Sequence, residues 1–94
     1  MATITAKGIT NHGYQEIQIT GEKRVESIVC SDGAFLTFVE TSINKARGQM
    51  ANGYVPPAGT MLQALAVLTM LYDYRNVTVD GDIEPMPHQP GVIY

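Results

Sequence analysis

The residues whose types and spacing are most suited to binding a ligand lie around the start of the second predicted helix. Residues 53–60 form a segment with glycines and prolines that leads into a helix beginning at Thr60. Free backbone N–H groups and the helix dipole at such a start attract anions. Arg47 and Arg75 would add positive charge, and Tyr54 would add an aromatic ring for stacking. This set predicts a site for an anionic, nucleotide-like molecule, formed at a subunit interface by Arg47, Tyr54, Thr60 and Arg75.

The same segment also has a simpler interpretation as a plain connection between two helices. It contains neither the Gly-x-x-x-x-Gly-Lys pattern nor the Gly-x-Gly-x-x-Gly pattern of nucleotide-binding loops. Any capped helix start presents the same free N–H groups, so the feature alone does not require a ligand. The ligand-binding hypothesis is therefore kept as an alternative.

The sequence predicts neither a metal site nor a cofactor. Carboxylates cluster in residues 80–84, but a calcium loop counted from Asp80 needs glycine at its sixth position and glutamate at its twelfth. Those positions hold Pro85 and Gly91, so the motif is rejected. The single cysteine and the two histidines lack a second metal ligand at close spacing. They are Cys30, His12 and His88.

Charge and cysteine content narrow the class of protein. Six basic and nine acidic residues give a net charge of −3, and the basic residues are scattered, so we do not expect a nucleic-acid binder. One cysteine excludes an internal disulfide and fits a reducing compartment. The N-terminus lacks a basic region followed by an apolar core, so we expect no signal peptide and a cytoplasmic protein.

Residues 1–30 are expected to form a β-meander. Polar and apolar residues alternate along residues 2–9 and again along residues 14–20, with β-branched residues frequent in both. A third strand follows over residues 24–30, where the alternation places Ile28 and Cys30 opposite Val25 and Val29. Short turns between these segments predict antiparallel neighbours.

A helix is predicted over residues 32–52. Ser31 and Asp32 are good N-cap residues, and the apolar positions that follow fall within one sector of a helix. Asn52 and Gly53 would stop it, because glycine readily adopts the left-handed conformation. This helix is amphipathic and should bury one face.

The second helix, predicted over residues 60–74, is apolar almost all the way round. Thr60 and Gln63 match a capping box at its start. At about 1.5 Å per residue it would span roughly 22 Å, too short for the ~30 Å of a bilayer core, so we expect no membrane span. One face carries Met61, Leu65, Leu68 and Tyr72. The opposite face predicts an oligomer interface formed by Val67, Met70 and Tyr74.

The last segments complete a single α+β domain over residues 1–94. A strand is expected over residues 75–80 and an extended tail over residues 81–94, because three prolines exclude a regular helix there. The predicted order is βββααβ followed by the tail. The antiparallel sheet of about four strands is covered on one face by the helical hairpin.

Three hypotheses for function follow from these patterns. The first is a small non-enzymatic binding protein that forms a homo-oligomer and interacts with a protein partner, as an inhibitor or accessory factor. It rests on small size, acidic charge and the absence of a catalytic constellation. The second is the binder of an anionic small molecule described above. The third is an enzyme that uses Cys30 or a histidine.

Overall fold

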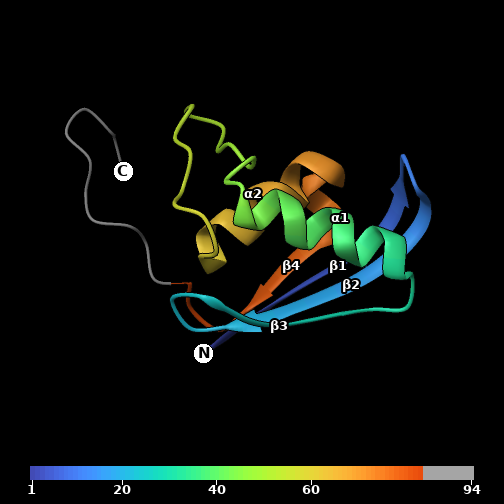
Figure 1. The fold of residues 1–94 in the computed structure, drawn as a ribbon, viewed down its shortest axis with the longest axis horizontal. Helices are drawn as coiled ribbons and strands as arrows, with labels where there is room; N and C mark the ends of the chain where they lie inside the picture. Colours follow the sequence, from blue (N-terminus) through green and yellow to red (C-terminus); the bar gives the residue numbers. More distant parts are fainter. Residues whose placement is uncertain (84–94) are drawn as a thin grey trace.

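The central element is a four-stranded antiparallel sheet whose strands lie in the order β3-β2-β1-β4. In this computed structural model, which describes residues 1–83, both helices pack on one face of the sheet (Figure 1). The predicted α+β fold with a meander, a helical hairpin and a returning strand is therefore confirmed. Residues 84–94 of the predicted tail lie outside the described part. The strands are β1 (Ala2–Thr10), β2 (Gly13–Gly21), β3 (Val25–Cys30) and β4 (Val77–Asp80).

The alternation of residues in β1 and β2 decides which face of the sheet the helices cover. Ile4 pairs with Ile19 across the two strands, and both are fully buried on the helix side. Their neighbours in sequence point to the opposite face, where Thr5 pairs with Gln18 and Lys7 is exposed. The sheet thus has one apolar face under the helices and one open face whose central positions are polar.

A β-bulge changes the predicted orientation of one residue in β3. The register between β2 and β3 shifts and leaves Glu26 without a partner of its own. Beyond this extra residue the alternation reverses, so Val25 packs against the core on the same side as Ile28 and Cys30. The sequence pattern wrongly placed Val25 with Val29 on the other face, because simple alternation does not reveal a bulge.

Helix α1 (Gly33–Asn44) begins where it was predicted to begin. The carboxylate of Asp32 accepts the backbone N–H of Phe35 at 3.0 Å, as an N-cap does. This bond is the main reason that the pKa of Asp32 lies below its ordinary value. The cap fixes the end of α1 that lies next to the turn between β1 and β2.

Helix α1 ends at Asn44, well before the predicted end at residue 52. Ala46 has a φ of +52°, which takes the chain out of the helix. The N–H of Arg47 then bonds to the carbonyl of Ser42, and that of Ala46 to Ile43, at 3.0 and 3.2 Å. This is the Schellman arrangement, which normally uses glycine at the left-handed position. An alanine there gives no sequence signal for a helix end.

Helix α2 (Met61–Leu71) is shorter than the predicted residues 60–74. The hydroxyl of Thr60 accepts the N–H of Gln63 at 3.1 Å, which confirms the N-cap, but the Gln63 side chain turns away from the helix start. The helix ends because the backbone of Tyr72 is extended, and its hydroxyl donates to the carbonyl of Gln15 at 2.9 Å. A long-range contact thus sets this boundary.

A short 3-10 helix, η1 (Tyr74–Asn76), occupies the start of the segment predicted to be a strand over residues 75–80. The carboxylate of Asp73 caps it by accepting the N–H of Arg75 at 3.0 Å. β4 therefore begins only at Val77. Within residues 1–83, no helix has the length and apolar character that a membrane crossing requires.

Candidate functional site

An apolar groove runs along the outer surface between α1 and α2. Its volume is about 150 Å³. Met70 is 61% exposed and Phe38 is 37% exposed, whereas Val67 is only 4% exposed and lies at the base. We call this hollow the inter-helix groove, and its lining residues are Phe38, Ser42, Arg47, Val67, Met70 and Leu71.

The inter-helix groove brings together residues that the sequence assigned to two different sites. Val67 and Met70, from the predicted interface, and Arg47, from the predicted anion site, all line it. Tyr74 does not belong to this face: the helix ends before it, and the residue lies in η1 with 75% of its surface exposed. The sequence placed Tyr74 with the other two because it extended the helix to residue 74.

The four residues predicted to bind an anion do not form one site within the chain. Thr60 precedes α2 and Arg75 follows it, so the 11 residues of the helix separate them by roughly 16 Å along its axis. The Thr60 hydroxyl already accepts the N–H of Gln63 and donates to the carbonyl of Pro57 at 2.8 Å. Tyr54 lies in the loop between the helices and is half-buried.

Arg75 has a partner of its own. Its Nε and Nη2 donate to the two carboxylate oxygens of Asp73 at 3.1 and 2.6 Å. These bonds lower the pKa of Asp73 to about 2 and raise that of Arg75. The charge that Arg75 would offer an anion is therefore largely balanced by Asp73, the residue before η1.

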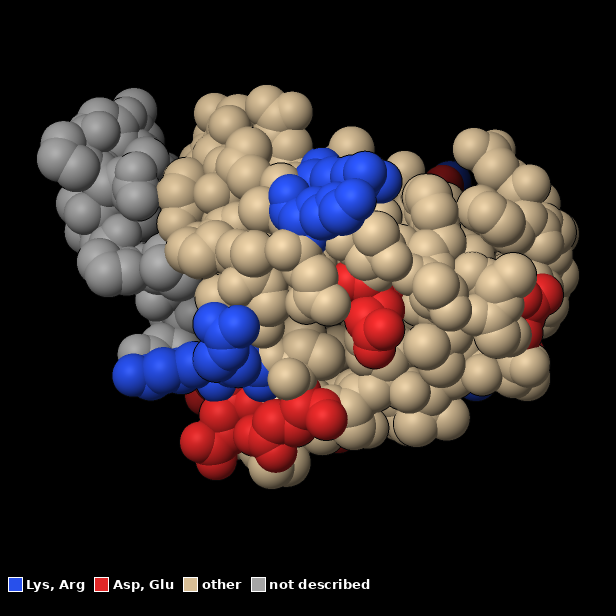
Figure 2. Space-filling view, in the orientation of Figure 1, with Lys and Arg blue, Asp and Glu red and all other residues tan. Residues whose placement is uncertain are grey.

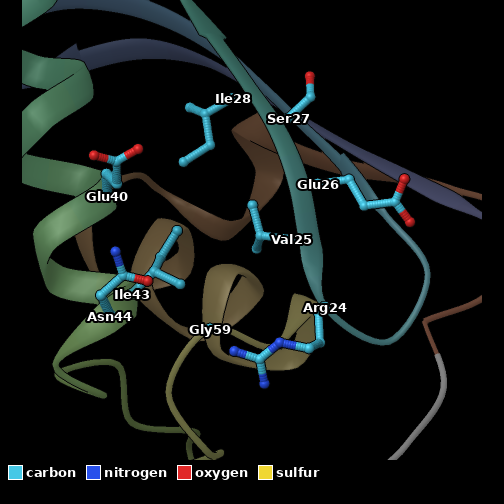
Figure 3. Close-up of a pocket in the computed structure, with 9 residues that line it drawn as sticks. All are labelled: Arg24, Val25, Glu26, Ser27, Ile28, Glu40, Ile43, Asn44 and Gly59. Atoms are coloured by element: carbon cyan, nitrogen blue, oxygen red, sulfur yellow. The ribbon is translucent and has the colours of Figure 1, made fainter.

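A second hollow, with a volume of about 190 Å³, lies between β3, the last turns of α1 and the loop before α2 (Figure 3). Ile28 and Ile43 face each other from the strand and the helix, while Glu40 projects from α1 toward the strand (Figure 3). We call it the β3-edge hollow. It is lined by Arg24, Val25, Glu26, Ser27, Ile28, Glu40, Ile43, Asn44 and Gly59.

The loop before α2 closes one end of the β3-edge hollow. Gly59 has a φ of +78°, and its carbonyl accepts the N–H of Val25 at 2.9 Å. A β-carbon at Gly59 would lie 3.2 Å from Cζ of Arg24. The absence of a side chain at Gly59 therefore leaves room for the Arg24 guanidinium beside the loop. In this way a glycine brings the loop against the edge strand.

Sequence reasoning missed the residues of the β3-edge hollow. Glu40 and Asn44 are four residues apart in a helix and so share one face, which is a readable signal. Arg24 carried no signal, because its position beside Gly59 depends on how the loop meets the sheet. On the face of the molecule shown in Figure 2, charges of both signs occur and no continuous basic surface forms.

Within residues 1–83, no three side chains of His, Cys, Asp or Glu lie close enough together to hold a metal ion. The histidine and the cysteine considered for catalysis in this part of the chain contact apolar side chains. His12 packs against Phe35 and Phe38, with ring centroids 5.4 and 5.0 Å apart. Cys30 is a free thiol that packs against the hydrophobic core. His88 lies outside the described residues.

In comparisons with known proteins, this chain matches no protein-family model, no curated protein and no solved structure.

Proposed function

We propose that this chain is a small non-enzymatic binding protein that associates with itself and with a protein partner, as an inhibitor or accessory factor. The observation that carries the proposal is the inter-helix groove, where apolar side chains of Phe38 and Met70 are exposed beside an apolar hollow. Exposed apolar surface of this kind gains free energy when another surface covers it. Association through the helical layer would provide that cover.

The opposite face of the sheet is more polar at its centre, while its exposed apolar side chains, Ile9, Tyr14 and Val29, lie toward the β1-β2 turn and on the edge strand. Its central positions are occupied by polar side chains, including Thr5, Lys7, Glu16 and Gln18. Polar side chains lose hydration when they are covered and gain little in return. The difference between the two faces favours a contact made by the helices.

A second copy of the chain is the occupant that suits the inter-helix groove best. The groove presents both a hollow and an exposed apolar side chain, that of Met70, whose sulfur accepts the N–H of Gln49 at 3.3 Å. In a two-fold contact each copy offers the same surface, so a surface carrying both a projection and a hollow can complement itself. We propose that Met70 of each copy enters the groove of the other.

The molar mass in solution tests this proposal. Light scattering at increasing protein concentration should show a rise from 10.2 kDa toward a multiple of that mass. A constant monomer mass up to millimolar concentration would contradict self-association.

We further propose a cytoplasmic location, which the single cysteine supports because free thiols persist in a reducing compartment.

A further inference from the structure

We infer that the β3-edge hollow binds an extended peptide segment of the protein partner, which pairs with the outer edge of β3 as an additional strand. This inference rests on the proposed binding function, but it uses a different surface from self-association. Addition of a strand to an exposed sheet edge is a general mode of peptide recognition, in which backbone hydrogen bonds supply affinity and side-chain contacts supply specificity.

The chain itself already occupies the first part of this edge in the same way. Gly59 accepts the N–H of Val25 at 2.9 Å, and the N–H of Met61 donates to the carbonyl of Lys23 at 2.9 Å. Between them, Arg24 and Thr60 form an antiparallel bridge. The loop before α2 therefore shows that an extended, antiparallel backbone fits against this edge.

Two prolines stop the chain from covering the rest of the edge. If the register of the Arg24–Thr60 bridge continued, residue 58 would face residue 26, and Pro56 would face Ile28. Proline has no N–H to donate, so Pro56 and Pro57 cannot extend a ladder of hydrogen bonds. The chain turns away here, and the β3-edge hollow opens where this short strand stops.

The backbone of β3 beyond the bulge offers free groups to a new strand. The two-residue turn between β1 and β2 makes Thr10 and Gly13 a hydrogen-bonded pair. From there, the backbone groups of successive residues in each strand point alternately to the neighbouring strand on one side and on the other. Carried through the register to β3, this alternation directs the N–H and C=O groups of Ile28 and Cys30 outward. No other hydrogen bond of the described residues uses these groups.

The walls of the hollow indicate which peptide it accepts. Ile28 provides the accessible apolar surface, because Ile43 beneath it is only 1% exposed, and the Glu40 carboxylate lies beside it on α1 (Figure 3). The partner peptide should therefore place a lysine or arginine on the helix side, with apolar or β-branched residues beside it. The long aliphatic stem of such a residue can lie on Ile28 while its charge reaches Glu40.

The test uses the full chain labelled with ¹⁵N and the blocked peptide Ac-Thr-Val-Lys-Val-Thr-NH₂, followed by NMR titration. The amide signals of Ser27, Ile28 and Cys30 should shift in a saturable way. Glu40→Gln should raise the peptide Kd about threefold, as expected for an exposed ion pair. Glu16→Gln, which removes the same charge from the polar sheet face, should leave the Kd unchanged.

Modified peptides separate strand pairing from simple charge attraction. N-methylation of alternate peptide residues blocks the backbone donors that face one side only. One of the two alternating patterns should abolish the shifts, and the other should preserve them. Equal binding by both patterns, or no preference over the peptide with glutamate in place of lysine, would overturn the inference.

Two further outcomes distinguish this inference from the proposed self-association. A chain that stays monomeric yet shows the expected peptide shifts would refute self-association and support the peptide site. A chain that oligomerises while its Ile28 amide signal does not shift with the peptide would support self-association and refute the peptide site. If that amide shifts when the protein alone is concentrated, the occupant of the edge is a second copy, and the partner peptide is ruled out.

Discussion

Gln63 in α2 hydrogen-bonds to both the N–H and the C=O of Gly48, in the loop after α1. Its Oε1 accepts the N–H of Gly48, and its Nε2 donates to the carbonyl of Gly48 at 3.2 Å. The same Nε2 donates to the carbonyl of Pro56 at 2.6 Å. Gln63 is fully buried, so this clamp fixes the loop against α2 and positions the neighbouring Arg47 at the inter-helix groove.

Replacement of Gln63 by leucine should lower the free energy of unfolding by about 3 kcal/mol. The substitution introduces an apolar side chain of similar size but leaves buried backbone groups of Gly48 and Pro56 without partners, each at a cost of about 1–3 kcal/mol. Urea unfolding measures the loss. Gln18→Leu on the exposed sheet face should change stability by less than about 0.5 kcal/mol. Equal effects of the two variants would mean that the clamp contributes nothing.

Replacement of Gly48 by alanine should also destabilise the helical hairpin, for a steric reason. The new β-carbon would lie 2.7 Å from the backbone nitrogen of Val67 and 2.8 Å from Cβ of Ala66. Relief of this overlap moves the loop away from α2, at a cost of about 1–3 kcal/mol. The matched control is Gly33→Ala, where a β-carbon meets no atom within 4 Å. Thermal unfolding should show a lower Tm only for the Gly48 variant.

Ala46→Gly should stabilise the protein by about 1 kcal/mol. Ala46 adopts a φ of +52° at the end of α1, a conformation that costs an alanine about 1–2 kcal/mol and costs glycine little. The greater freedom of glycine in the unfolded chain offsets part of the gain. Ala34→Gly within α1 should instead destabilise by about 0.5–1 kcal/mol. A lower stability for both variants in urea would disprove the strain at Ala46.

Tyr72 should make the protein sensitive to alkaline pH. Burial raises the pKa of its hydroxyl from 10.0 to about 12, so the folded state favours the protonated form. The resulting stabilisation is complete below pH 10 and is lost as the pH rises through about 12. Tyr72→Phe should flatten this part of the pH profile of stability. It should also cost about 1 kcal/mol at neutral pH, because the bond to Gln15 is lost.

The control for Tyr72 is Tyr74→Phe, which removes a hydroxyl from a side chain that is 75% exposed. Its unfolding free energy should follow that of the unchanged protein from pH 7 to pH 12. An equal flattening in both variants would show that the burial of Tyr72 is not the cause.

Met70→Lys should weaken self-association at least tenfold while the chain remains folded. Met70 is 61% exposed, so a charge is tolerated in the monomer, but burial of an unpaired charge in the contact is unfavourable. Sedimentation or light scattering measures the change. Val29→Lys is the matched control, because Val29 is also 61% exposed but lies on the open sheet face. Loss of association in the Val29 variant alone would move the interface to the sheet.

Much of the fold was readable from local patterns. Period-two alternation identified β1 and β2, and the side chains of Asp32 and Thr60 identified the starts of both helices. Such features depend on neighbours a few residues away, through backbone dihedral preferences and caps. The same holds for the apolar character of α2, in which Met61, Val67 and Leu68 are buried.

Only the tertiary structure decided where the elements end and what lies beside them. α2 ends at Leu71 because Tyr72 reaches Gln15, and Gln63 leaves its expected capping role because Gly48 needs a partner. The β3-edge hollow lies beside the bridge between Arg24 and Thr60, two residues far apart in the chain. These contacts join segments distant in sequence, and their free energy outweighs local preference. No local pattern contains that information.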